Sequence, residues 1–252
     1  MSYIIDNKVL NPKGAKEEAH SILLFISLHL IWHLTMHKLV LTSDGSHTIY
    51  VPELDEHYHS IHGAVQESDF IFIKNGLDAC RANPVHIFEV GFGTGLNALL
   101  TAANSLKYNR EVFYTSIEKY PLEKSVINTL NHHLYAGTDK TIYDKIHSAV
   151  WNEMTDICMN FHLTKIKSDI ITYSITGNYD VIYFDAFGPD KQPEMWSRDI
   201  FERLSAVTKR GGILVTYSAK GEVKRCLRSV GFQVTLLPGP PGKRQMIRAI
   251  KI

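Results

Sequence analysis

The chain has 252 residues, of which 44% are hydrophobic and 21% charged, a balance typical of a globular protein with one large or two small domains. Its net charge of +1 excludes a strong field for polyanions, so any contact with nucleic acid must use a local basic patch. Cys80, Cys158 and Cys226 are far apart and odd in number, which argues against a disulfide framework or a cysteine zinc site. The 13 histidines are scattered and form no zinc-binding pattern with a nearby acid, so no metal is expected.

A strongly apolar window covers residues 21–35. It is shorter than the roughly 20 residues that a membrane-spanning helix needs, so no membrane association is predicted. The segment before it carries mixed charges and no small-residue cleavage site follows, which disfavours a secretory signal. Our hypothesis is that residues 1–35 are an N-terminal extension from a non-native start. The alternative is an amphipathic helix that packs on the domain.

Residues 36–84 are interpreted as a small N-terminal β cap. Residues 38–42 and 48–51 alternate apolar with polar side chains on either side of a Ser-Asp-Gly-Ser turn, which predicts a β-hairpin. The following residues, 53–75, are rich in acids and histidines and mix apolar with polar positions. No internal repeat or low-complexity tract interrupts this region.

A nucleotide-binding unit begins at residue 85. Residues 85–90 form a short apolar, β-branched run that predicts a buried strand, and residues 96–106 have helical spacing. A strand, a glycine turn and a helix open a doubly wound α/β fold, and glycine suits the turn because backbone without a Cβ can press against a ligand. The turn contains Gly91, Gly93 and Gly95.

The spacing of these glycines is informative. Dinucleotide sites favour G-x-G-x-x-G, where pyrophosphate meets the helix N-terminus, whereas this chain has G-x-G-x-G preceded by Glu89. An acid at this position suits a cationic ligand better than a diphosphate. E-x-G-x-G-x-G after a strand resembles motif I of class I methyltransferases, which bind S-adenosylmethionine. A tight turn in any other α/β domain stays open as the alternative.

Strands and helices alternate through the rest of the chain, and a hairpin ends it. The pattern predicts strands at 112–117, 160–167, 180–184 and 213–217. It predicts helices at 121–131, 193–210 and 220–230, then a hairpin of 232–237 with 245–252. This order matches the seven-stranded Rossmann-like sheet of class I methyltransferases, whose last strand is antiparallel, so residues 85–252 are interpreted as the methyltransferase domain. Ligand-facing residues are expected at the carboxyl ends of its strands.

Three acids follow predicted strands. Glu118 lies slightly more than 20 residues beyond the glycines, where an acid can accept both ribose hydroxyls of an adenosine cofactor. Asp169 could accept the adenine amino group, although an aspartate there could instead cap a helix. Asp185 could orient an acceptor or take its proton. Nearby Phe187 and Trp196 could make cation–π contacts, with a core position as the alternative for Trp196.

One basic concentration stands out in the nearly neutral chain. Lys220, Lys224 and Arg228 are four residues apart and share a helix face, and Lys243 and Arg244 lie on a neighbouring loop. Such a patch could contact phosphates without reading bases. An ordinary solvated helix face has the same pattern and stays open as the alternative.

Six stretches together resemble one family. They are YHSIHGAVQESDFIFI, FEVGFGTGLN, IEKYPL, FDAFGPDKQPEMW, YSAKGEVKRCLRSVGF and GPPGKRQM. In this order they resemble the methyltransferase that completes 5-methylaminomethyl-2-thiouridine at the tRNA wobble position, often the N-terminal half of a bifunctional protein, MnmC, with a flavin-dependent oxidase as its other half. The resemblance runs from about residue 50 to residue 252, and no flavin fingerprint occurs in the chain.

The resemblance implies a set of site residues. S-adenosyl-L-methionine would be held by Glu89, Gly91, Phe92, Gly93, Thr94, Gly95, Asn97, Glu118, Lys119, Asp169 and Asp185. The place where the aminomethyl group enters would be lined by Asp185, Phe187, Pro189 and Lys191. The substrate would contact Glu67, Trp196, Lys220, Lys224, Arg228, Lys243 and Arg244.

The implied function is a cytoplasmic, monomeric enzyme that uses S-adenosyl-L-methionine to methylate tRNA after separate enzymes have made the aminomethyl group. Three alternatives stay open from the residues alone. The first is a class I methyltransferase that acts on an amine of a protein or small molecule. The second is a nicotinamide-dependent oxidoreductase, which the glycine spacing and Glu89 disfavour. The third is a non-catalytic tRNA-binding module.

Overall fold

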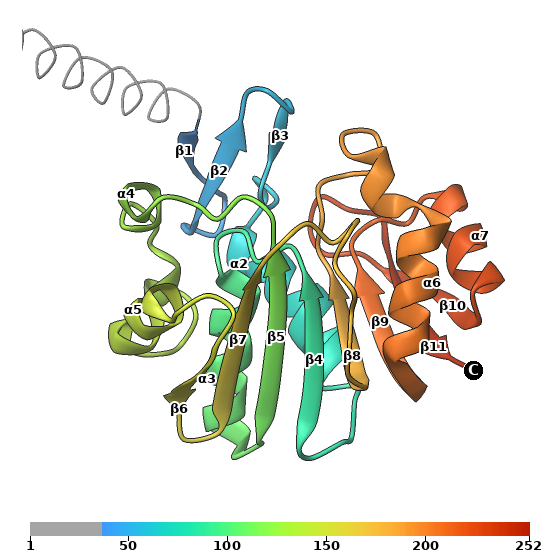
Figure 1. The fold of residues 1–252 in the computed structure, drawn as a ribbon. Helices are drawn as coiled ribbons and strands as arrows, with labels where there is room; N and C mark the ends of the chain where they lie inside the picture. Colours follow the sequence, from blue (N-terminus) through green and yellow to red (C-terminus); the bar gives the residue numbers. More distant parts are fainter. Residues whose placement is uncertain (1–36) are drawn as a thin grey trace, which may run out of the picture.

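The structure is a computed structural model that describes residues 37–252. The extension predicted at residues 1–35 lies outside the described residues. A large twisted sheet carries helices on both faces, and a small sheet stands beyond one end of its strands (Figure 1). In the described part of the chain, no helix is both long and apolar enough to cross a membrane.

The central sheet has eight strands in the order β10-β11-β9-β8-β4-β5-β7-β6. They are β4 (Val85–Val90), β5 (Val112–Glu118), β6 (Met154–Cys158), β7 (Phe161–Lys167), β8 (Tyr179–Phe184), β9 (Thr208–Thr216), β10 (Phe232–Pro238) and β11 (Gln245–Lys251). The five middle strands, from β9 to β7, are parallel, while β11 runs antiparallel to both β9 and β10. The predicted strands and terminal hairpin are confirmed. The prediction of seven strands misses the antiparallel edge strand β6.

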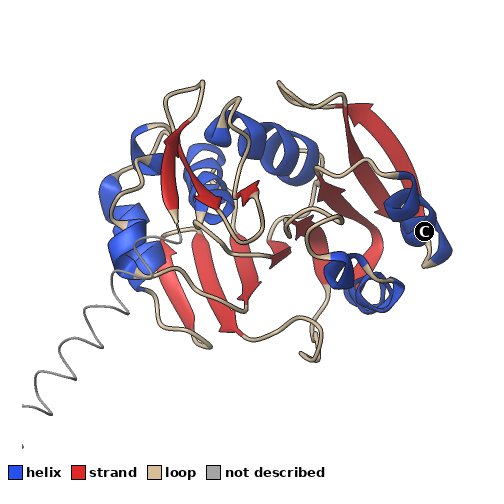
Figure 2. Ribbon diagram, turned by 90° about the horizontal axis from the view of Figure 1, so that it is seen from above, coloured by secondary structure: helices blue, strands red, loops and turns tan. Residues whose placement is uncertain are grey.

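The helices divide between the two faces of this sheet, as the view from above shows (Figure 2). They are α2 (Ala64–Ser68), the π-helical η1 (Asp69–Leu77), α3 (Leu96–Tyr108), α4 (Lys124–Ile127), η2 (His132–Leu134), α5 (Lys140–Ser148), η3 (Pro193–Trp196), α6 (Arg198–Val207) and α7 (Gly221–Ser229). Ile87 and Val181 pack in one core cluster with η1, α3 and α5. Their chain neighbours Phe88 and Ile182 pack in the other cluster with α6 and α7, because successive strand residues point to opposite faces.

The predicted hairpin forms a three-stranded antiparallel sheet of β1 (Lys38–Leu41), β2 (His47–Val51) and β3 (Glu56–His57). Residues 64–77 of the predicted β cap are helical and not β. Phe72 and Leu77 of η1 are buried in the same core cluster as α3, so this part of the cap belongs to the packing of the main sheet. The division of the chain into domains at residue 84 stays a prediction.

Two predicted helices differ from the structure, and so does the stretch between residues 131 and 160, for which no element was predicted. The helix predicted at 121–131 is reduced to the four residues of α4. The side chain of Asn131 instead bonds the small sheet, donating to Gly45 O (2.9 Å) and accepting from His47 N (2.7 Å), and this tertiary contact outweighs local helix propensity. The helix predicted at 193–210 is divided at the extended residue Ser197 into η3 and α6, and α6 ends at Val207 because the next residues pair with β8 as the start of β9. Helix α5 and strand β6 were not foreseen.

Candidate active site

A cavity of about 540 Å³ lies at the carboxyl ends of β4, β5 and β8, where a doubly wound fold binds its ligands. The small sheet and the segment after it, residues 56–62, form its opposite wall, and the β10–β11 turn contributes Lys243. Its size suits a nucleoside-sized ligand together with a reacting group. Within residues 37–252, no group of three potential metal ligands was found, and the three cysteines are free.

The glycine turn forms the floor of the cavity. Gly91, Gly93 and Gly95 have φ angles of 92°, 48° and 71°. Residues that carry a Cβ rarely adopt such positive φ angles. A Cβ at Gly91 would lie 2.6 Å from the backbone oxygen of Asp185, and one at Gly93 would lie 3.0 Å from the ring of Tyr58. These close approaches explain why the turn consists of glycines, and they leave the backbone and the N-terminus of α3 open toward a ligand.

Glu89 lies behind the turn and not in the cavity. It is 1% exposed, and it accepts hydrogen bonds from Ser116 Oγ (2.6 Å) and from Asn97 Nδ2 (3.0 Å). Burial raises the pKa of Glu89 to about 8, so the carboxyl is mostly protonated at neutral pH. The expectation that Glu89 faces a cationic ligand as a free charge is therefore corrected, because its side chain holds Asn97 in place.

Asn97 connects Glu89 with the acid that ends β8. Its Nδ2 also donates to Asp185 Oδ2 (2.8 Å), while its Oδ1 is buried and has no hydrogen-bond partner within residues 37–252. Asn97 is one of the residues that line the cavity, so this acceptor is available for a donor group of a ligand. Burial raises the pKa of Asp185 to about 7 against the opposing hydrogen bond of Asn97, so this carboxyl can both hold and release a proton near neutral pH.

The predicted cofactor acids gather at the β5 end of the cavity. Glu118 accepts from Gly93 N (3.1 Å) and Tyr120 N (2.8 Å), which ties the end of β5 to the glycine turn. Asp169 pairs with Lys119 at 2.9 Å. All three side chains line the cavity, as do Phe92 and Thr94, so the structure brings them together with the glycines.

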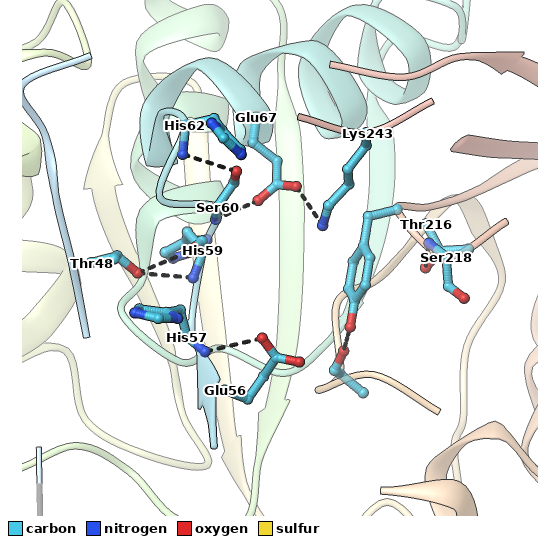
Figure 3. A network of polar contacts seen from close by, with 12 residues as sticks. Thr48, Glu56, His57, His59, Ser60, His62, Glu67, Thr216, Ser218 and Lys243 are labelled. Atoms are coloured by element: carbon cyan, nitrogen blue, oxygen red, sulfur yellow. Dashed lines mark hydrogen bonds and ion pairs between the residues drawn. The ribbon is translucent and has the colours of Figure 1, made fainter. Parts of the chain in front are cut away.

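A polar network links four distant segments at the other end of the cavity (Figure 3). Glu67 of α2 is buried, accepts from Ser60 N (2.7 Å) and pairs with Lys243 Nζ (2.7 Å). The Lys243 ammonium lies 4.1 Å from the centre of the Tyr217 ring, and the Tyr217 hydroxyl donates to Ala186 O (2.8 Å). The sequence singled out Glu67 and Lys243 separately but gave no signal that they pair, and it missed Tyr217.

Two further side chains from the small-sheet wall were missed. Tyr58 packs edge-on against Phe187 with ring centroids 5.0 Å apart, and this pair gives the cavity an aromatic wall. His59 is buried with its Nε2 2.7 Å from Thr94 Oγ1, and burial lowers its pKa to about 4, so it is neutral at pH 7. The His-rich composition of this segment was the available signal, but spacing alone does not reveal a contact across 35 residues.

Several predicted site residues lie outside the cavity. Trp196 is buried against Phe184 and Phe201, and its Nε1 donates to Phe187 O (2.8 Å), so it supports the loop from the core and does not face a substrate. The other predicted residues that do not line the cavity are Glu89, Gly95, Pro189, Lys191, Lys220, Lys224, Arg228 and Arg244.

Two of these lysines, Lys191 and Lys220, form ion pairs around the loop after β8. Lys191 pairs with Asp55 at 3.6 Å, and Lys220 pairs with Asp190. Lys224 and Arg228 follow on α7, and no ion pair engages either of them among residues 37–252. A role for this surface in phosphate binding stays a prediction.

Known sequences resemble the chain over most of its length. A family model described as S-adenosyl-L-methionine-dependent methyltransferase matches residues 134–252. The tRNA 5-methylaminomethyl-2-thiouridine biosynthesis bifunctional protein MnmC of Cupriavidus metallidurans is 30% identical over 225 residues, covering 82% of this chain and 33% of that protein. The protein of the same name from Actinobacillus pleuropneumoniae is 28% identical over 234 residues, covering 82% and 34%. The chain therefore spans about a third of the length of these relatives.

Solved structures share the fold. MnmC2 from Aquifex aeolicus aligns over 94% of this chain and 83% of its own, with a TM-score of 0.69 and 22% identity. Spermidine synthase from Thermotoga maritima aligns over 83% of this chain and 70% of its own, with a TM-score of 0.50 and 14% identity. At these identities the likeness concerns the fold, and it confirms the predicted class I methyltransferase architecture with its small antiparallel N-terminal sheet.

Proposed function

We propose that this chain, which is an S-adenosyl-L-methionine-dependent methyltransferase, methylates the aminomethyl nitrogen of wobble 5-aminomethyl-2-thiouridine in tRNA. Its sequence aligns with about a third of the length of the related MnmC protein. The product is 5-methylaminomethyl-2-thiouridine. The observation that carries the proposal is the joining, in one cavity, of a glycine turn, an aromatic wall and an excess of carboxylates.

The excess of acidic side chains in the cavity favours the binding of two cationic groups, the sulfonium of the cofactor and the ammonium of the substrate. Six carboxylic acids and two lysines line it, and both lysines are engaged in ion pairs with two of the acids. The remaining acids suit a sulfonium and an alkylammonium by Coulombic attraction. The same acids suit the diphosphate of a nicotinamide cofactor poorly, so the oxidoreductase alternative is not favoured.

The residues around the glycine turn fit the cofactor. S-adenosyl-L-methionine, when bound, supplies a methyl group on a positively charged sulfur. The unpartnered Oδ1 of Asn97 would accept from one of its polar groups, and the glycine turn, where no side chain stands between backbone and cavity, would lie against it. Glu118 and Asp169, at the β5 end, would receive the nucleoside.

The acceptor must lose a proton before it can react. An alkylammonium has a pKa near that of lysine, about 10.4, and its protonated nitrogen has no lone pair for attack. Removing that proton at pH 7 costs roughly 4–5 kcal/mol. The aromatic wall of Tyr58 and Phe187 lowers this cost by disfavouring the charged form, and Asp185 accepts the proton. Alignment of the two reactants supplies much of the acceleration.

The tRNA, the cellular location and the source of the aminomethyl group are parts of the same proposal. In this proposal, a separate activity prepares the aminomethyl group of the substrate. Basic residues without ion pairs among residues 37–252, Lys224, Arg228 and Arg244, would contact phosphates of the tRNA. The protein would work as a monomer in the cytoplasm, consistent with its three free cysteines.

The test is methyl transfer from labelled S-adenosyl-L-methionine to tRNA from cells that lack this activity, followed by nucleoside analysis. We expect label in 5-methylaminomethyl-2-thiouridine. Binding of the cofactor without label in tRNA would overturn the substrate and redirect the search to amines of proteins or small molecules.

A further inference from the structure

A second carboxylate faces the cavity from the small sheet. Glu56, in the two-residue strand β3 (labelled in Figure 3), lines the cavity together with Tyr217 and Ala186. It is half-buried, and its Oε1 accepts only from the backbone N–H of His57 (3.1 Å). Among residues 37–252, its Oε2 has no hydrogen-bond or ion-pair partner.

Three other half-buried or buried acids of the cavity have both carboxylate oxygens engaged. Glu67 binds Lys243 and the Ser60 backbone, and Asp169 binds Lys119. Glu118 accepts two backbone N–H groups, and Asp185 accepts the Asn97 amide. Glu194 also lines the cavity but is exposed. Glu56 therefore keeps one carboxylate oxygen without a partner, as does Asp185, whose Oδ1 takes part in no hydrogen bond among residues 37–252.

The free oxygen of Glu56 converges with the phenol of Tyr217. A Cβ built on Gly188 would lie 3.7 Å from Tyr217 Oη and 3.8 Å from Glu56 Oε2, so both oxygens border one small space beside the loop after β8. Because the Tyr217 hydroxyl donates its hydrogen to Ala186 O, the lone pairs of its oxygen stay available as acceptors.

Asp185 is near the same phenol. Burial raises the pKa of Tyr217, and the charges of Asp185, Glu56 and Glu67 raise it further, so the phenol stays protonated. Since Glu67 is neutralised by Lys243, two carboxylates and one phenol oxygen are free to surround a cation at this end of the cavity.

We propose that Glu56 and Tyr217 bind the primary ammonium of the substrate, with Glu56 as the counter-ion that selects an amine. This inference rests on the proposed function and names the group that recognises its substrate. An ammonium has three N–H donors, and Glu56 and Tyr217 take two of them. The third proton passes to the Asp185 carboxylate, which leaves a neutral amine with its lone pair. The amine then forms the N–CH₃ bond as the S–CH₃ bond breaks, the bonding electrons stay on sulfur, and the product is a secondary ammonium.

The experiment measures binding and does not depend on turnover. Affinity is compared for two otherwise matched tRNAs, one with 5-aminomethyl-2-thiouridine and one with 2-thiouridine at the wobble position. We expect the wild-type protein to prefer the first by about tenfold, the size of one charge-assisted hydrogen bond at a half-exposed site. Glu56→Gln should remove this preference while leaving affinity for the second tRNA unchanged.

Glu194→Gln is the matched control, because it removes an exposed cavity acid of the same chemistry and should keep the preference. Cofactor affinity should be unchanged in Glu56→Gln, which also reports that the variant is folded. Its KM for the aminomethyl tRNA should rise about tenfold, with a smaller change in kcat.

The outcomes separate the two proposals. If the wild-type protein methylates aminomethyl tRNA and Glu56→Gln keeps the preference, the role of Glu56 is overturned and the proposed function stands. A loss of cofactor affinity in Glu56→Gln would also overturn it, since Glu56 would then serve the cofactor. A wild-type protein that methylates no aminomethyl tRNA would overturn the proposed function and this inference with it.

Discussion

The two ends of the cavity are assembled differently. The glycine-turn end comes from neighbouring stretches of chain, the β4–α3 turn and the end of β5, and is tied together largely by backbone. The opposite end comes from distant segments, with Glu56 on β3, Glu67 on α2, Tyr217 after β9 and Lys243 in the β10–β11 turn. The first end depends on backbone shape, whereas the second depends on charges brought together by packing.

Asp185 lies between the two ends, and its replacement should have the largest effect. Asp185→Asn keeps the shape and removes the proton acceptor, so we expect turnover to fall about 10²–10³-fold while cofactor affinity changes less than about threefold. The pKa of Asp185 is about 7, and its ionised form accepts the proton. The wild-type rate should therefore increase with pH around pH 7, and the rate of the variant should lack this increase. Single-turnover rates at several pH values test this. Equal losses of turnover and cofactor affinity would instead assign Asp185 to the cofactor.

Gly91→Ala tests the backbone-built end. The added Cβ meets the Asp185 carbonyl at 2.6 Å in a positive-φ turn, so we expect the free energy of unfolding to fall by about 3 kcal/mol and the cofactor affinity to fall with it. Gly137→Ala is the matched control. Its φ is 68° and a Cβ there meets nothing within 4 Å, so only the positive-φ cost of about 1 kcal/mol applies. Denaturant unfolding of both variants gives the comparison, and equal losses would show that the approach of Gly91 to Asp185 is not tight.

His59→Gln tests how the small sheet supports the glycine turn. Burial lowers the folded-state pKa of His59 to about 4, below the unfolded value of about 6.5, so the unfolded state binds more protons between these values. Stability contributed by the neutral ring is fully present above pH 6.5 and is lost as the pH falls toward 4, by up to about 1.4 kcal/mol per pH unit. We expect the Gln variant, which can still bond Thr94, to show a flatter decline of unfolding free energy over that window. An unchanged slope would mean that His59 does not titrate with unfolding.

Much of the fold was predictable because its signals are local. The buried strand at 85–90 matches β4, and the five predicted parallel strands and the terminal hairpin appear close to their expected bounds. Parallel strands covered on both faces are nearly continuous apolar runs, which a sequence displays directly. The shortness of α4 and the edge strand β6 were not predictable in this way, because Asn131 bonds the small sheet instead of continuing a helix and β6 exists by pairing with β7.

The same distinction holds for the site. The sequence by itself determined the glycine turn and the acids Glu118, Asp169 and Asp185, because a position just after a parallel strand already implies the ligand-binding edge of the sheet. Only the tertiary structure decided that Glu89 is buried, that Trp196 packs in the core, and that Glu56 and Tyr217 converge on one space. The physical reason is that desolvation and charge pairing depend on which side chains meet in space, and Glu56 and Tyr217 come from segments more than 100 residues apart, β3 and the residue after β9.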